Sequence, residues 1–258
     1  MNAHAIKHPT HDTHRGPEVR AVGIAEPFRW IAAGVRDFRR TPGRSLLYGV
    51  LFAAVCLATY ALTAALPWFT VAFLTGLLLI GPYLATGLYV AARQMESGES
   101  VSIRAAWQTL VARKTNLALF ALFLALVMAA WVRLAALLFA IKFDLLSPSI
   151  EGYLGILSGQ GDPAVVIYFV VIGFLLAATV FVTSALAVPM IVDRDSGPFT
   201  AIAASARAVA HNWPAMLVWA AIIVALTAVG IATFFAGFAV LFPVLGYATW
   251  HSYRAMAE

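Results

Sequence analysis

Histidines are the first residues of this chain that could do chemistry. The run HPTHDTH places His8, His11 and His14 three residues apart, and His4 precedes them. Imidazoles at such a spacing could chelate a soft divalent metal. Pro9 lies inside the run and opposes a helix that would align the rings. A polar tail needs no metal, so we predict neither a metal site nor a cofactor.

One ionisable residue falls within a predicted membrane span, where such residues are the default functional candidates. Arg133 lies 19 residues after Lys114, roughly 28 Å along a helix axis. At that depth an arginine can extend to the far headgroup layer, so it is either an anchor or part of a pore. Prolines in the return spans would kink those helices and line a cavity with it. The candidate cavity or pore residues are Arg133, Pro82, Pro189 and Pro243.

No motif indicates an enzyme. The chain has no phosphate-binding Gly-Lys-Ser/Thr loop, no His-Glu-x-x-His pair and no Gly-x-Ser-x-Gly elbow. Neither His211 nor His251 lies mid-span, so haem ligation within the bilayer lacks its ligands. A lipid-modifying enzyme would need Asp193, Asp195 and His211 to converge at one membrane surface. We therefore predict a protein that is not an enzyme.

The elements that position these residues are membrane spans. The chain is 62% hydrophobic and 11% charged, whereas a soluble domain carries about 25% charged residues. A span needs about 20 apolar residues, and the last uncharged run is long enough for two spans. The uncharged runs cover 45–66, 67–92, 115–132, 163–192 and 212–250. The sequence therefore predicts an all-α, polytopic integral membrane protein with six transmembrane helices.

The basic residues predict the orientation of these spans. All but two of the 17 lysines and arginines lie before span one, between spans two and three, between spans four and five, or after span six. The exceptions are Arg133 and Lys142. The positive-inside rule places both termini in the cytoplasm, and charge so distributed does not indicate a nucleic-acid partner. We predict a disordered cytoplasmic tail over 1–25 and a single membrane domain over 26–258.

A short amphipathic helix precedes the first span. Phe28, Ile31, Val35 and Phe38 follow a 3, 4, 3 spacing that places them on one helix face. Arginines lie off that face, as expected for a helix in the headgroup layer. Anionic lipid would add roughly 1 kcal/mol per well-placed basic residue. The candidate lipid-contacting residues are Arg29, Trp30, Arg36, Arg39 and Arg40.

This helix is repeated in the sequence. Shifts of 72 and 171 residues bring it onto 101–111 and 199–210, where apolar positions recur. Small residues coincide as well, at Ala33-Gly34, Ala105-Ala106 and Ala204-Ser205. A fixed period of this kind outranks single-residue signals. We predict three units in a pseudo-threefold repeat, over about 26–97, 98–196 and 197–258, each an amphipathic helix followed by a hairpin of two spans. The apolar insertion 142–162 predicts a short helix on the outer surface.

The chain resembles an uncharacterised six-span bacterial inner-membrane family. The family is a domain of unknown function, and some members carry the label "putative cytochrome c oxidase subunit I". The matching motifs are Arg29-Trp30 with Gly34, Asp37 and Phe38, then Pro42-Gly43, Ser45 and Tyr48-Gly49, then Gly81-Pro82, Gly87-Leu88-Tyr89 and Glu96-x-Gly98. The resemblance implies a multi-pass protein of the bacterial inner membrane. It supplies no activity, and it is compatible with an auxiliary or assembly role beside a respiratory complex.

Two hypotheses follow for function. The leading one is a scaffold or accessory subunit of a membrane complex, whose partners are anionic lipid headgroups and other membrane proteins. The alternative is a transporter or channel for a small or lipidic substrate. A polar cavity between the kinking prolines and Arg133 favours transport, and a dry, closely packed bundle favours a scaffold.

Overall fold

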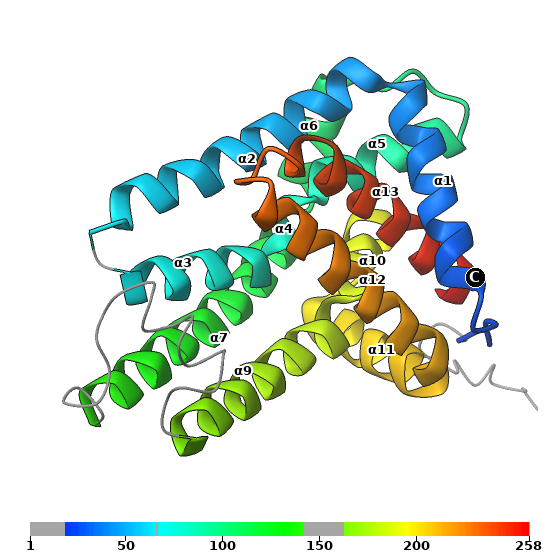
Figure 1. Ribbon diagram of the computed structural model, residues 1–258. Coiled ribbons are helices and arrows are strands. Elements are labelled where there is room, and N and C mark those ends of the chain that lie inside the picture. The colour runs from blue at the N-terminus through cyan, green and yellow to red at the C-terminus, as the bar shows by residue number, and fades with distance from the viewer. Residues whose placement is uncertain (1–18, 66, 142–162, 258) are drawn as a thin grey trace, which may run out of the picture.

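The structure is a computed structural model that describes residues 19–65, 67–141 and 163–257, and in these ranges all of its regular secondary structure is helical (Figure 1). The all-α expectation is confirmed. The predicted outer helix over 142–162 and the histidine run lie outside the described residues. The helices are α1 (Glu26–Arg40), α2 (Pro42–Thr63), α3 (Pro67–Leu79), α4 (Gly81–Leu84), α5 (Thr86–Glu96), α6 (Ile103–Ala112), α7 (Lys114–Ile141), α9 (Pro163–Ser184), α10 (Ala187–Arg194), α11 (Pro198–His211), α12 (Trp213–Ala232) and α13 (Phe238–Ala257).

Four helical stretches in the described part of the chain are long and apolar enough to cross a membrane. They are Pro42–Thr63, Lys114–Leu134, Val170–Arg194 and Trp213–Ala232. Predicted span two is divided among α3, α4 and α5, and the longest of these has 13 residues. Predicted span six is α13, whose last turns carry polar residues. By length and composition alone, four of the six expected spans are therefore identified as candidate membrane spans.

Two of the three prolines predicted to kink the return spans lie at or near a helix break. Proline has no N–H to donate and its ring clashes with the preceding turn. Gly81-Pro82 separates α3 from α5 as expected, with α4 as a single turn between them. Pro189 lies in the first turn of α10, so the break comes just before it, after Ser184. Pro243 lies inside α13, which is continuous.

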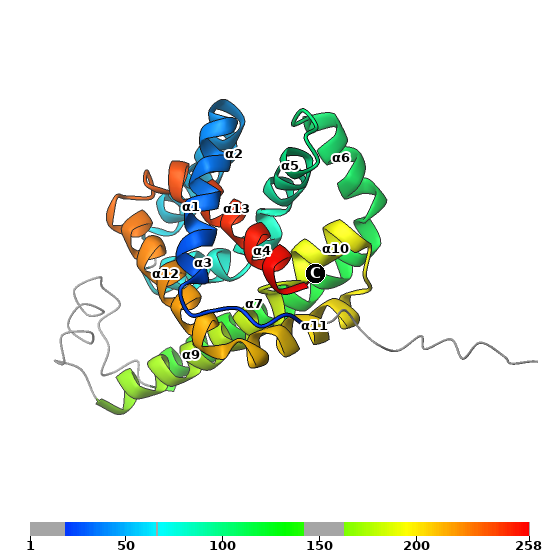
Figure 2. The same cartoon turned by 90° about the vertical axis from the view of Figure 1, so that its right-hand side faces the viewer.

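Three helices form the centre of the molecule. The helices α5, α10 and α13, called here the central helices, contact one another pairwise, and Figure 2 shows them inside the arch made by the others. Nearly every residue of α10 up to Val192 is buried. The largest fully buried side chains include Tyr89 of α5 and Tyr247, Trp250 and Tyr253 of α13. The core is thus aromatic and lies where the three helices meet.

Each of the three short amphipathic helices contacts one of the central helices. α1 contacts α13, α6 contacts α5, and α11 contacts α10. A buried small residue lies at the same repeat position in each: Gly34, Ala106 and Ser205. These positions are separated by the shifts of 72 and 171 residues found in the sequence. The predicted repeat register therefore places corresponding helix faces against protein.

Two glycines allow helices to approach α13 closely. A Cβ on Gly34 of α1 would lie 2.5 Å from the backbone oxygen of Val244, and one on Gly49 of α2 would lie 2.0 Å from that of Ala239. Both neighbours are backbone atoms of α13, which cannot move aside as a flexible side chain can. Small residues serve this purpose in membrane helix packing. α1 and α2 are thereby fixed to α13.

The segment before α1, Val19 to Ala25, crosses to the start of α12. Asn212 accepts a hydrogen bond from the backbone N–H of Val22 at 2.8 Å and donates one to the backbone oxygen of Arg20 at 3.0 Å. The N–H of Arg20 donates to the backbone oxygen of Met256 at 3.0 Å. Part of the predicted tail, from Val19 to Ala25, is therefore held against α12 and α13 in this structure.

Candidate functional site

The last turn of each central helix carries one arginine, and the three form what we call the arginine ring: Arg93 of α5, Arg194 of α10 and Arg254 of α13. The α5 arginine donates from Nη1 to the backbone oxygen of Val192 in α10, at 3.3 Å. The α10 arginine donates to the backbone oxygen of Ala257 in α13. The α13 arginine donates from Nε to Oε1 of Glu96 in α5, at 3.1 Å. Each arginine thus reaches the C-terminal turn of the next helix.

This ring suits the electrostatics of helix ends. The last carbonyls of a helix lack intrahelical donors and carry partial negative charge. A cation from a neighbouring helix satisfies such a carbonyl and interacts favourably with the dipole. Two of the three contacts are of this kind, and the third replaces the carbonyl with the Glu96 carboxylate. The ring therefore ties the three helix ends together.

Aromatic side chains of α13 extend the network. Trp250 donates from Nε1 to Oε2 of Glu96 at 3.0 Å, and Tyr253 donates its hydroxyl proton to Oδ2 of Asp193 at 2.8 Å. Burial, together with the neighbouring Asp193 carboxylate, raises the pKa of Tyr253. Tyr253 therefore keeps the proton that it donates. Asp193 also lies 3.8 Å from Nη1 of Arg254.

The ring borders a cavity of about 280 Å³. Its lining is polar, with opposite charges that mostly pair with each other, and consists of Arg93, Glu96, Ser97, Asp193, Trp250 and Arg254. Among the described residues, no three His, Cys, Asp or Glu side chains are placed to hold a metal ion. The arrangement is better suited to holding helix ends than to moving protons or electrons.

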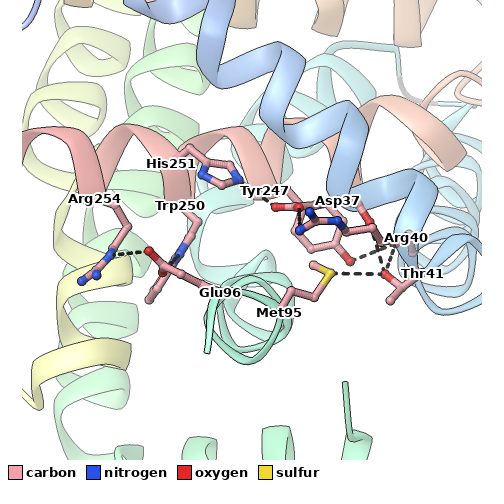
Figure 3. Close-up of polar contacts among 10 residues, drawn as sticks. Asp37, Arg40, Thr41, Met95, Glu96, Tyr247, Trp250, His251 and Arg254 are labelled. Atoms are coloured by element: carbon pink, nitrogen blue, oxygen red, sulfur yellow. Dashed lines mark hydrogen bonds and ion pairs between the residues drawn. The ribbon is translucent and has the colours of Figure 1, made fainter. Parts of the chain in front are cut away.

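A second polar contact joins α1 to α13 (Figure 3). Asp37 of α1 is 5% exposed, and its Oδ2 lies 2.7 Å from Nε2 of His251 in α13. Arg40 contributes a weaker contact, 3.4 Å from Nη1 to the other carboxylate oxygen. One turn before His251 on α13, the hydroxyl of Tyr247 lies 2.9 Å from that of Ser45 in α2, in a buried position. The α1–α13 contact therefore combines a close backbone approach with the Asp37–His251 pair, and α2 adds a polar pair of its own.

Two of the three central helices lie in a stretch of the chain that can be compared with known proteins. Residues 69–193 match the model of a family described as predicted integral membrane protein (DUF2189). The DUF2189 segment runs from α3 through α10 and contains Arg93, Glu96 and Asp193. This matched segment covers less of the chain than the resemblance inferred from the sequence. The family has no known function. No curated protein and no solved structure matches the chain.

The arginines expected to contact lipid lie on the outer side of α1. Arg36 and Arg39 are exposed. Arg29 is also exposed and pairs with Glu26 at 2.6 Å. Arg40 is mostly exposed while it contacts Asp37. These four positions are compatible with headgroup contact, and that contact stays a prediction.

Trp30 lies elsewhere than expected. It is 3% exposed and packs edge-to-face on Trp219 of α12, with ring centroids 5.7 Å apart. The reason is its helix position, because Trp30 shares with Gly34 and Asp37 the face that meets protein. Its side chain therefore contacts protein in this structure, and not lipid.

The four residues proposed to line one cavity do not meet. Pro82 lines an apolar cavity of about 110 Å³ between α2, α4, α5, α12 and α13, and the other three are not among its lining residues. Pro189 and Pro243 are buried in α10 and α13. Arg133 is exposed on α7.

The three polar residues that a lipid-modifying enzyme would need at one place do not form a common site. Asp195 pairs with Arg113 at 2.7 Å, whereas Asp193 accepts from Tyr253. His211 ends α11 and is exposed. The three side chains thus have different surroundings, and the lipid-enzyme hypothesis gains no support.

Sequence reasoning missed the arginine ring and the Asp37–His251 pair. A signal for the ring was present, because each return span ends in an arginine. A signal for the pair was weaker: Asp37 is an acid between the arginines Arg36 and Arg39 of a basic helix. Neither signal names the partner, since the contacts join residues 63 to 214 positions apart.

Proposed function

We propose that this chain is a scaffold or accessory subunit of a membrane complex, with six spans and no catalytic role. The observation that carries the proposal is the arginine ring with the aromatic core beneath it. Together they close the meeting point of the central helices, which is where a substrate path between the repeats would run. A protein whose central helices are held together in this way is suited to binding partners through its outer surface.

The six-span arrangement is part of this proposal. α3, α4 and α5 together form the second span, kinked at Pro82, and α13 forms the sixth. The cyclic docking of α1 on α13, α6 on α5 and α11 on α10 supports a pseudo-threefold repeat. So does the cyclic order of the arginine contacts. The bundle then resembles a three-part ring whose units each contribute one central helix.

The orientation follows from the same residues. The arginine ring and the exposed arginines of α1 lie toward the end of the molecule at which the chain terminates. By the positive-inside rule this end faces the cytoplasm, and the proposed location is the bacterial inner membrane. Anionic headgroups at that surface are proposed partners of Arg29, Arg36, Arg39 and Arg40.

Mild crosslinking of native membranes, followed by affinity purification through a C-terminal tag, tests the scaffold role. We expect one or more membrane proteins, respiratory subunits among the candidates, to be recovered in a fixed ratio. The Gly34→Leu variant, which prevents close docking of α1, should lose them, and Gly43→Ala should retain them because a Cβ there meets nothing within 4 Å. Recovery of the chain alone after crosslinking would refute the scaffold role.

A second candidate function, transport of a small or lipidic substrate, is favoured by one observation. The apolar cavity beside Pro82 lies at a helix break, and broken helices mark many transport sites. Its volume of about 110 Å³ suits a few methylene groups or a small apolar molecule. A specific lipid enriched in the purified protein, with no protein partner, and lost in Gly246→Leu would favour transport.

A further inference from the structure

The outer face of α6 carries large apolar side chains that nothing in the described structure covers. Ile103, Trp107 and Val111 follow one another at intervals of four residues and are 61%, 68% and 44% exposed. Residues so spaced share one face of a helix. An adjacent side packs on α5 through Ala106. α6 therefore has one protein-facing side and one uncovered apolar stripe.

The helix that follows α6 is apolar enough to cross a membrane. α7 follows after Arg113, and its exposed surface includes Leu119, Leu122 and Leu126. It contains Lys114–Leu134, one of the four stretches long and apolar enough to cross a membrane. In a membrane, hydrocarbon covers the exposed leucines of such a span, and α6 directly precedes it in the chain.

Basic and polar residues lie beside the stripe. Arg104 and Gln108 are exposed on a third side of α6, and Lys114 is exposed at the junction with α7. An in-plane helix with a tryptophan on its apolar side and cations on its polar side is typical of the headgroup layer. Cations there favour anionic lipid. The charge and the apolar stripe thus fit one partner, a lipid surface.

We propose that α6 lies in the plane of the membrane, with Ile103, Trp107 and Val111 among the upper acyl chains and with Arg104 and Lys114 at anionic headgroups. This inference deepens the function proposed above, because it rests on the membrane orientation and names the lipid contact of one helix. It does not require any protein partner, so the two proposals can fail independently.

Spin labelling of the reconstituted protein tests the depth of α6. The single cysteine, Cys56, is replaced by alanine, and a nitroxide is attached in Trp107→Cys, in Ile103→Cys or in the control Gln108→Cys. The labelled full-length proteins are placed in vesicles of phosphatidylcholine, or of equal parts phosphatidylcholine and phosphatidylglycerol. Collision rates with oxygen, which enters hydrocarbon, are compared with those of a water-soluble nickel chelate.

We expect the labels at positions 103 and 107 to collide with oxygen more than with nickel, and the label at 108 to show the reverse. Phosphatidylglycerol should move the first two deeper, and Arg104→Gln with Lys114→Gln should abolish that shift. Free nickel access at 103 and 107 would overturn the proposal. Low access of both reagents with spin–spin broadening would also overturn it, in favour of a contact with a second copy.

Discussion

α1 and α6, two helices at equivalent positions of the proposed repeat, have different surroundings. Both dock through a small residue, Gly34 in α1 and Ala106 in α6. On α1 the same face also carries Trp30 and Asp37, which are both buried. On α6 the corresponding positions are Ser102, which caps the helix, and Thr109. The small residue sets where the helix docks, and its neighbours set how firmly it is held.

The partners differ accordingly. α1 contacts the His251 side chain of α13 and closely approaches the α13 backbone, and it also contacts Trp219 of α12. Thr109 of α6 donates instead to its own backbone, at the oxygen of Ala105. α6 therefore makes fewer side-chain contacts within the protein than α1 does, and more of its surface is left uncovered by protein. One sequence pattern yields a structural helix in the first unit and an exposed one in the second.

The two tryptophans give the largest expected contrast. Trp30→Ala should lower the free energy of unfolding by about 3 kcal/mol, because it leaves a cavity against Trp219. Trp107→Ala should change it by less than about 0.5 kcal/mol in detergent, since that side chain is exposed. Thermal unfolding followed by circular dichroism measures both. Equal losses would mean that α1 and α6 are packed alike.

The close approach of α1 to α13 gives the next effect. Gly34→Leu should cost about 2 kcal/mol, because its Cβ would lie 2.5 Å from the Val244 oxygen and 3.0 Å from the Ala248 nitrogen. Gly43→Ala is the control, with nothing within 4 Å of its Cβ. The shift in melting temperature in detergent reports both. An unchanged melting temperature in Gly34→Leu would show that the packing of α1 does not depend on this close approach to α13.

The polar pair of α1 should contribute less. Asp37→Ala leaves His251 without its acceptor in a half-buried position and should cost about 1.5 kcal/mol. Thr109→Ala, at the equivalent position of α6, should change stability by less than about 0.5 kcal/mol. Chemical denaturation in detergent compares the two. A loss in Thr109→Ala as large as that in Asp37→Ala would remove this distinction between the helices.

The smallest expected effect concerns the end of α5, on which α6 docks. A double-mutant cycle of Arg254→Met and Glu96→Gln should give a coupling below about 1 kcal/mol, because the two side chains are 30% and 42% exposed. The Arg29–Glu26 pair of α1 is the control, and its exposed arginine should give a smaller coupling still. Coupling of several kcal/mol at Arg254–Glu96 would make the ring a dominant stabilising element.

The helical class and the break at Gly81-Pro82 could be predicted because they depend on local chemistry. Long apolar runs form helices in lipid, where every backbone group must be satisfied internally, and proline interrupts them. The offsets also matched small residues in the three short helices, but the sequence did not predict that Gly34, Ala106 and Ser205 would be the buried ones.

The candidate site could not be predicted to the same degree. The arginine ring depends on which helix ends meet, and that arrangement is decided by packing among α5, α10 and α13. Trp30 was assigned to lipid from its residue type, although its spacing from Gly34 and Asp37 places it on the protein-facing side. Residue type suggests whether a side chain will contact lipid or protein, whereas its position on the helix decides which of the two it contacts.

The hydrogen bond between Arg20 and Met256 brings the two ends of the described chain together. In the proposed repeat, the segment before α1 is the counterpart of the loops before α6 and α11. A gene rearranged to start within 97–102, with a short peptide joining the old ends, should encode the same arrangement of helices. Chain order and spatial order are thus separable here, because the first and last helices of the chain are neighbours.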